Sequence, residues 1–263
     1  MSPSQRGALD GGVRLCAIVP TYDNPRTIRG VVEALRAYVE DVIVVDDGSG
    51  PEGRAAVEAL GREGLARVEH RARNGGKGAA VKTGLSVADR LGFTHALQVD
   101  ADGQHDLSDV PRMTAAMRAH PDALVLGAPR YDESAPTARL HGRKTTKFWT
   151  DFETFGEVIE DPMCGFRIYP VQAALAARAR GDRMDFDIEI AVRMAWAGVP
   201  VVNVPTQVRY VAAEEGGVSH FQLVRDNVRI SLLHARLSMR SILLRLLPWL
   251  RPRPRRLPAP QAP

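Results

Sequence analysis

Short apolar segments alternate with helical segments through the first half of this chain, and this alternation limits the possible folds more than any other feature. The expected strands are residues 15–19, 42–45, 66–69, 93–99 and 123–126. The expected helices are residues 27–38, 54–60, 77–91 and 107–120. Strands this short and this apolar, separated by helices, predict an α/β fold with a mostly parallel sheet covered by helices on both faces.

The second half of the chain is less regular. Residues 129–147 predict a loop, whereas 148–159 and 186–196 have the spacing of helices. Residues 199–211 predict a strand that Pro205 either confines to the sheet edge or divides in two. We therefore expect a disordered N-terminus (1–13), a main domain (14–215), a basic amphipathic helical segment (216–250) and a disordered tail rich in proline and arginine (251–263).

Positive charge is concentrated at the C-terminal end. The net charge of the chain is +4, yet residues 221–263 hold nine arginines, no lysine and one acid, so that the remainder is acidic. Four of the arginines share one face of the expected helix 221–247, and Trp249 follows it. Such a helix can lie on an anionic membrane surface; alternatively it packs on the main domain with its arginines in water. The acidic main domain, which lacks interleaved aromatics, disfavours nucleic acid as a partner.

The composition also bears on the compartment. Two cysteines, Cys16 and Cys164, predict no disulfide framework, and residues 1–12 lack the apolar core of a signal peptide. No apolar run is long enough to span a bilayer. We expect a cytoplasmic protein bound peripherally to the inner face of the membrane.

Polar residues follow four of the expected strands at the point where each strand ends. Tyr22 follows the first, Asp46 and Asp47 the second, residues 71–77 the third, and Asp100 with Asp102 the fourth. The carboxyl ends of parallel strands share one edge of a sheet, where ligands bind. The sequence therefore predicts one cleft lined by these loops.

Asp100 and Asp102 carry the strongest chemical signal. Residues i and i+2 of an extended segment point the same way, so two carboxylates converge just past the strand. A hard divalent cation with oxygen ligands would relieve their repulsion and leave room for phosphate oxygens. Taken alone, a loop with two solvated aspartates explains the motif equally simply.

Five motifs together resemble family-2 glycosyltransferases with the GT-A fold, and in particular the dolichol- and polyprenol-phosphate mannosyl- and glucosyltransferases. They are residues 19–22 (VPTY), 44–49 (VVDDGS), 74–80 (NGGKGAA), 100–105 (DADGQH) and 161–167 (DPMCGFR), in family order over roughly residues 14–210. The resemblance implies an inverting transfer of a hexose from a UDP- or GDP-sugar to a polyprenyl phosphate or other lipid-linked acceptor.

The resemblance also implies roles for individual residues. The donor site would comprise Pro20, Tyr22, Asp46, Asp47, Asn74, Lys77, Gly78, Asp100 and Ala101. Asp100, Asp102 and Gln104 would hold Mg²⁺ or Mn²⁺ beside the diphosphate. Arg130 would lie near the phosphates, Arg143 and Lys144 would assist, and Asp161 and Arg167 would flank the acceptor.

The acceptor decides whether a general base is needed. A phosphate acceptor is already anionic, whereas a hydroxyl acceptor must lose a proton. Asp161 is then the first candidate base, followed by Asp187 and Glu189, although acids in the first turn of a helix are also favoured by its dipole.

Departures from the family pattern keep other readings open. Asp23-Asn24 stands where the family has Asn-Glu, which leaves the nucleotide undecided, and the Gln-x-x-Arg-Trp signature of processive synthases is missing. Residues 216–221 resemble the corresponding segment of bacterial members of this glycosyltransferase family. A sugar-phosphate nucleotidyltransferase would have a glycine-rich basic loop after the first strand, and a silent nucleotide-sugar- or membrane-binding module needs no intact Asp100 and Asp102. Residues 75–78 lack the spacing of a dinucleotide-binding loop.

Overall fold

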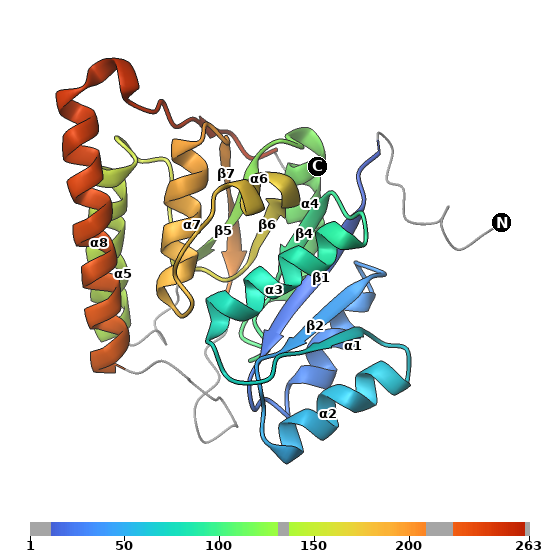
Figure 1. The fold of residues 1–263 in the computed structure, drawn as a ribbon. Helices are drawn as coiled ribbons and strands as arrows, with labels where there is room; N and C mark the ends of the chain where they lie inside the picture. Colours follow the sequence, from blue (N-terminus) through green and yellow to red (C-terminus); the bar gives the residue numbers. More distant parts are fainter. Residues whose placement is uncertain (1–11, 131–136, 209–222, 261–263) are drawn as a thin grey trace.

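An eight-stranded sheet runs through the computed structural model, which describes residues 12–130, 137–208 and 223–260 (Figure 1). The strand order is β3-β2-β1-β4-β6-β5-β7-β8. The strands are β1 (Leu15–Thr21), β2 (Val42–Asp46), β3 (Arg67–His70), β4 (His95–Gln98), β5 (Leu124–Arg130), β6 (Arg167–Pro170), β7 (Val201–Gln207) and β8 (Arg256–Leu257). β6 is antiparallel to β4 and β5, and the other neighbours are parallel. The expectation of a mostly parallel sheet is confirmed.

Helices cover both faces of this sheet, because successive side chains of each buried strand point to opposite faces. On one face, Ala17 and Val19 pack with helices α1 (Ile28–Arg36), α2 (Pro51–Arg62) and α4 (Val110–Ala119). On the other face, Cys16 and Ile18 pack with α3 (Lys77–Arg90), α6 (Val171–Ala176) and α7 (Asp185–Trp196). Short 3-10 helices, Leu107–Asp109 and Pro248–Leu250, precede α4 and follow the last helix.

Two further helices form an outer layer beside α7. α5 (Thr137–Glu153) and α8 (Leu223–Leu246) pack against each other and against α7, away from the sheet (Figure 1). Ile230, Leu233 and Leu237 of α8 form a separate small core with Ile188 and Val192 of α7. Among the described helices, none is both long and apolar enough to cross a membrane.

The expected loop 129–147 is wrong for residues 129–130 and 137–147, and its residues 131–136 lie outside the described residues. β5 continues to Arg130, and α5 begins at Thr137 and ends at Glu153. Residues 137–153 contain no proline and one glycine, so nothing in that stretch prevents a helix. Glu153 at its end forms hydrogen bonds with His234 and Ser238 of α8. The helix expected over 148–159 is correct only to Glu153, because the chain then turns through Phe155, whose φ is +63°.

The expected disordered tail is also wrong for residues 251–260. Arg256–Leu257 form β8 and pair in parallel with Val201 and Val202 of β7. Leu257 packs against the main core, and Arg256 forms an ion pair with Glu160. β8 covers only the start of β7, so Pro205 lies on an exposed edge, as a residue without an N–H requires. The expected disorder of residues 1–13 falls almost entirely outside the described residues.

Candidate active site at the carboxyl edge of the sheet

A buried lysine joins three segments at the carboxyl edge. Lys77, the first residue of α3, lies 2.8 Å through its Nζ from Oδ1 of Asp100 and 2.8 Å from Oδ2 of Asp187. Asp100 follows β4, and Asp187 lies in the first turn of α7. Gly76 precedes Lys77 with φ +101°, a conformation open to glycine, and this turn aims α3 at the end of β4.

The electrostatics of this cluster are strongly coupled. Burial disfavours the charged form of Lys77, but Asp100 and Asp187 outweigh burial and raise the pKa of the ammonium. Burial likewise opposes the charge on Asp100, yet Lys77 and His105 hold the pKa of that carboxyl well below its usual range. For Asp102 the balance is reversed, because burial and the neighbouring Asp100 both raise its pKa. A second cation beside Asp102 would therefore relieve a real electrostatic cost.

Gly165 closes the cluster from above. A Cβ at this glycine would lie within 2.6 Å of both Lys77 Nζ and Asp100 Oδ1, so any side chain there would displace these groups. The antiparallel direction of β6 explains the approach: Arg167 pairs with Gln98, so the segment before β6 reaches the point where β4 ends. Residues 161–166 therefore meet Asp100 across the sheet edge.

A buried polar network supports Asp187 from below. Gln98 Nε2 donates to its carboxylate at 3.3 Å, and Tyr169 donates through its hydroxyl to Gln98 Oε1 at 2.8 Å. Arg167 is fully buried and donates to the carbonyls of Cys164 and Asp187. Its guanidinium is enclosed and holds the turn before β6, so in this structure Arg167 presents no surface to an acceptor, and its expected place beside the acceptor stays a prediction.

Asp46 and Asp47 are engaged by the protein itself. Asp46 accepts hydrogen bonds from the Ser49 backbone N–H at 2.9 Å and from His70 Nδ1 at 2.8 Å. Burial opposes its charge, but the bonds from Ser49 and His70 prevail and lower its pKa. Asp47 accepts from the backbone N–H groups of Gly75 and Gly76, and Arg71 lies 3.1 Å away. The two carboxylates therefore hold the loop that follows β3 beside the loop that follows β2.

The remaining donor-site candidates lie on the same edge in different environments. Pro20 is buried in β1, and Tyr22 is half-buried just past it. Ala101 is buried, and its carbonyl accepts from Thr27 Oγ1 at 2.6 Å. Asn74 accepts a long hydrogen bond from Arg183. The space beside Gly78 is filled by Phe186, so this glycine permits close packing of α3 on α7.

Asp23, which departs from the family pattern, has a clear structural role. Its Oδ1 accepts from the Gly50 N–H at 2.8 Å, and its own N–H donates to Ser49 Oγ at 2.9 Å. The displaced carboxylate thus ties the loop after β1 to the loop after β2.

Asp102, Gln104 and His105 complete the loop after β4. The Asp102 carboxylate accepts from the Gln104 N–H at 3.0 Å and is only partly shielded from solvent. His105 Nε2 lies 3.7 Å from Asp100 Oδ2, and its ring stacks at 5.2 Å on Phe166. Within the described residues no three His, Cys, Asp or Glu side chains converge as a complete metal site. A cation here would take further ligands from a bound donor.

The acceptor-side candidates lie on α5 and on the segment before β6. Arg143 of α5 forms an ion pair with Asp161, whose other oxygen accepts from the Met163 N–H at 2.8 Å. Arg130 is exposed at the end of β5, and Lys144 is exposed on α5. The structure thus brings Arg143 and Asp161 together, and places Arg130 at the same edge as Asp100.

Glu189, a second candidate base, is a structural residue. It is fully buried, and its carboxylate accepts from the backbone N–H groups of Arg180 and Gly181 and from Arg236 of α8. Asp187 is likewise held by Lys77. The alternative explanation, that a helix dipole favours Asp187 and Glu189, does not account for these specific partners.

Sequence reasoning missed several residues of this site. Gly165 and His105 lie within the motifs at residues 161–167 and 100–105, but were assigned no role from the sequence. Gln98 and Tyr169, which were also assigned no role, are polar residues within apolar strands. A polar side chain in a buried strand needs a partner, and that requirement is the signal that could have found the network.

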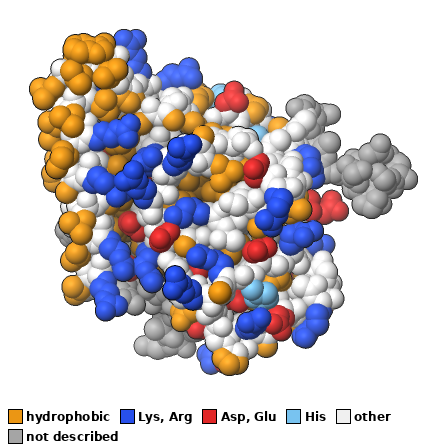
Figure 2. Space-filling view, viewed as in Figure 1, with side chains coloured by type: hydrophobic (Ala, Val, Ile, Leu, Met, Phe, Trp, Pro, Cys, Tyr) orange, Lys and Arg blue, Asp and Glu red, His pale blue; other side chains and the backbone are white. Residues whose placement is uncertain are grey.

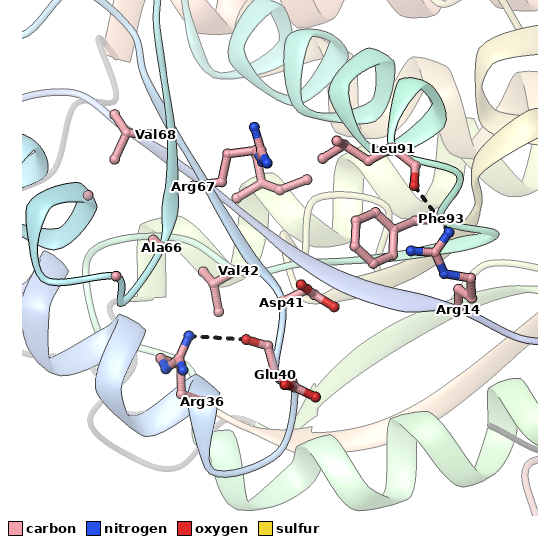
Figure 3. Close-up of a pocket in the computed structure, with 13 residues that line it drawn as sticks. Arg14, Arg36, Glu40, Asp41, Val42, Ala66, Arg67, Val68, Leu91 and Phe93 are labelled. Carbon is pink, nitrogen blue, oxygen red and sulfur yellow. Dashed lines mark hydrogen bonds between the residues drawn. The ribbon is translucent and has the colours of Figure 1, made fainter. Parts of the chain in front are cut away.

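One pocket lies elsewhere in the described part of the chain. Figure 3 shows it at the amino ends of β1–β3, with Arg14, Arg36, Asp41 and Arg67 around it. Arg14 and Arg36 already donate to backbone carbonyls, and Arg14 stacks on Phe93. The cavity is opposite the edge where the strand-following loops converge, so we do not assign the chemistry to it.

Comparisons with known proteins identify the family of this chain. The model of glycosyl transferase family 2 matches residues 16–174. The polyprenol monophosphomannose synthase of Mycolicibacterium smegmatis is 30% identical, over 73% of this chain and 76% of its own. The undecaprenyl-phosphate mannosyltransferase of Micrococcus luteus is 26% identical, over 78% and 86%.

Solved structures agree on the architecture. Glucosyl-3-phosphoglycerate synthase from Mycobacterium tuberculosis, in its complex with UDP, superposes with a TM-score of 0.62 at 16% identity, covering 88% of this chain and 80% of that one. At this identity the likeness concerns the fold, which is GT-A. The chain belongs to glycosyltransferase family 2.

Proposed function

We propose that this glycosyltransferase moves a hexose, with inversion and with a divalent metal, from a UDP- or GDP-sugar to a polyprenyl phosphate or other lipid-linked acceptor. The observation that carries the proposal is the cluster at the end of β4. There Asp100, Asp102 and Gln104 form one loop beneath Gly165, at the edge where such sheets bind ligands. Relatives that act on polyprenol and undecaprenyl phosphates support the class of acceptor.

The residues present fit Mg²⁺ or Mn²⁺. The donor set is oxygen, Asp102 carries an electrostatic cost that a cation would relieve, and the incomplete ligand set leaves positions for phosphate oxygens. A metal held there would stabilise the charge of the departing nucleoside diphosphate as a Lewis acid. A solved structure of the glucosyl-3-phosphoglycerate synthase contains Mn²⁺ with UDP-glucose, which favours the same arrangement here.

The chain's own residues have distinct tasks in this proposal. Lys77 keeps Asp100 in place, and Asp47 fixes the glycine loop that borders the donor. Arg143 offers a guanidinium to an acceptor phosphate, while its partner Asp161 orients it. For an acceptor that is already anionic no base is required; for a hydroxyl acceptor Asp161 remains our candidate.

We also propose that the enzyme works at the inner face of the membrane, where a lipid-linked acceptor and a water-soluble nucleotide sugar meet. The arginine-rich C-terminal segment favours this location, because anionic headgroups attract basic residues.

The test is a transfer assay with purified full-length chain, UDP-hexoses and GDP-mannose, and a detergent-solubilised polyprenyl phosphate. We expect product with one donor only when Mn²⁺ or Mg²⁺ is present, and NMR of the product should show an inverted anomeric centre. Transfer that survives removal of divalent metal, or no transfer and no calorimetric binding with any donor, would contradict the proposal.

A further inference from the structure

The two long faces of α8 differ sharply from each other. One face packs on the protein through Ile230, Leu233 and Leu237. The opposite face is apolar but exposed, and its members are Val228 (54% exposed), Leu232 (66%), Met239 (65%), Ile242 (49%), Leu243 (56%) and Leu246 (70%). With exposed Ala235, most of these residues recur at alternating spacings of four and three, which is a continuous stripe along a helix. Nothing in the described part of the chain covers this stripe.

The apolar surface continues beyond α8. Trp249 and Leu250 follow the helix and are 76% and 59% exposed, and Phe148 of α5 is 64% exposed. Ring contacts join Phe148 to Trp149 and Trp149 to Phe152, which lies 4.0 Å beneath the Arg245 guanidinium of α8. Figure 2 shows hydrophobic side chains gathered along the edge formed by α8, with lysine and arginine side chains beside them. Patches this extended mark interaction sites rather than ordinary surface.

The charges beside the stripe identify its partner. Arg225, Arg229, Arg236 and Arg240 share one flank of the helix, and the single acid of the segment, Asp226, is buried and paired with Arg229. A second copy of α8 would bring like charges together where paired helices need opposite ones. An apolar face with an arginine flank and a terminal tryptophan instead matches the boundary between anionic headgroups and acyl chains.

We propose that the exposed face of α8, extended by Phe148 and Trp249, lies in the surface of an anionic lipid bilayer. This inference rests on the proposed function, because a lipid-linked acceptor is the reason the enzyme would need a bilayer. The surface itself is identified from the exposure of its apolar side chains and the charge beside them. α5 also connects this surface to the active site, because Arg143 precedes Phe148 by little more than one helical turn. The first turn of α8 lies on the same side of the molecule as the carboxyl ends of the strands (Figure 1). A lipid head group at Arg143 and a bilayer on this face are therefore compatible.

Vesicle binding of the full chain tests the surface without any need for catalysis. We expect the wild type to sediment with vesicles of phosphatidylcholine plus phosphatidylglycerol and to stay in solution with phosphatidylcholine alone. The triple change Leu232→Gln, Met239→Gln, Leu246→Gln should weaken binding at least about tenfold, and so should Arg225→Gln with Arg253→Gln. The matched controls change exposed residues elsewhere on the protein. They are Tyr38→Gln, just after α1, and Arg118→Gln, on α4.

Trp249 gives a second readout, since its emission should shift to the blue on vesicles and be quenched by brominated lipid. Unchanged vesicle binding of the triple variant, or no binding by the wild type, would overturn the proposal. A wild-type dimer that the triple change dissociates would also overturn it, in favour of a second copy. With a short-chain, water-soluble polyprenyl phosphate the triple variant should keep its transfer rate; absence of transfer in both proteins would instead count against the proposed function alone.

Discussion

The proposed donor side and the proposed acceptor side of this molecule are built in opposite ways. On the donor side, Asp46, Asp47, Asp100 and Lys77 are buried or nearly so, and each is paired with a group of the protein. On the acceptor side, α5 and α8 expose arginines and large apolar side chains. The comparison shows that the proposed donor side is held by hydrogen bonds within the protein, whereas the exposed apolar side chains of α5 and α8 are not covered by any described part of the chain.

Removal of the metal ligand should have the largest effect. We expect Asp102→Ala to lower kcat/KM by about 10³-fold, equivalent to about 4 kcal/mol of transition-state stabilisation. Folding should be intact, because Asp102 makes one hydrogen bond to backbone and is partly exposed. Steady-state kinetics with Mn²⁺ and Mg²⁺ measure the loss. Asp106→Asn, four residues further on, is the control; an equal loss there would argue for a general disturbance of the loop.

Two lysines of α3 provide a direct comparison of buried and exposed ion pairs. Lys77→Met removes the cation that joins the partly exposed Asp100 to the buried Asp187, so we expect a loss of about 3 kcal/mol in the free energy of unfolding. Lys82→Met breaks an exposed pair with Asp182 and should cost at most about 1 kcal/mol. Urea denaturation compares them, and Mn²⁺ should restore stability to the Lys77 variant more than to the wild type. Equal losses of unfolding free energy in the two variants would contradict the expected difference between the Lys77 and Lys82 ion pairs.

Gly165 tests how closely the acceptor-side segment must approach the donor side. A Cβ there would collide with Asp100 and Lys77, so Gly165→Ala should lower kcat by about 10²-fold through displacement of these groups. Gly156→Ala is the matched control, because a Cβ at Gly156 meets no atom within 4 Å. Stopped assays at saturating donor provide the comparison, and normal turnover by Gly165→Ala would refute a tight closure.

Acid should weaken the donor side through Asp46. Its pKa in the folded protein is lower than the ordinary 3.8, so the stability it adds is complete above that value and is lost as pH falls through the folded pKa. The difference in unfolding free energy between wild type and Asp46→Asn should be largest above about pH 5 and should narrow towards about pH 2. Denaturant titrations across this pH range measure the difference in unfolding free energy. A difference that increases in acid would contradict a lowered pKa for Asp46.

The smallest expected effect is the reactivity of the two cysteine thiols in the folded protein. Burial raises the pKa of both Cys16 and Cys164 to about 12, so neither should react with a disulfide reagent at about pH 8 in the folded protein. Both should react on unfolding. Cys164 lies in the segment over Asp100 and Cys16 within β1, so any native reaction should begin at Cys164. Mass spectrometry after a pulse of reagent tells them apart, and faster labelling of Cys16 would show that the sheet opens first.

Local sequence was sufficient where local patterns set the structure. The alternation of apolar strands and amphipathic helices predicted the sheet, and the polar residues after each strand predicted the edge that holds the candidate site. It was insufficient for α5, which contacts a helix some ninety residues later in the chain and is joined to it through buried Glu153, and for β8, which is two residues long.

The sequence by itself determined the fold class, the loop with Asp100 and Asp102, and the basic C-terminal helix, because each follows from periodicity or composition within a short window. Only the tertiary structure decided that Lys77 joins Asp100 to Asp187, that Gly165 lies over them, and that Arg167 is enclosed rather than presented to an acceptor. The physical reason is that these contacts depend on the antiparallel direction of β6 and on the packing of α3 against α7, which bring together residues far apart in the chain.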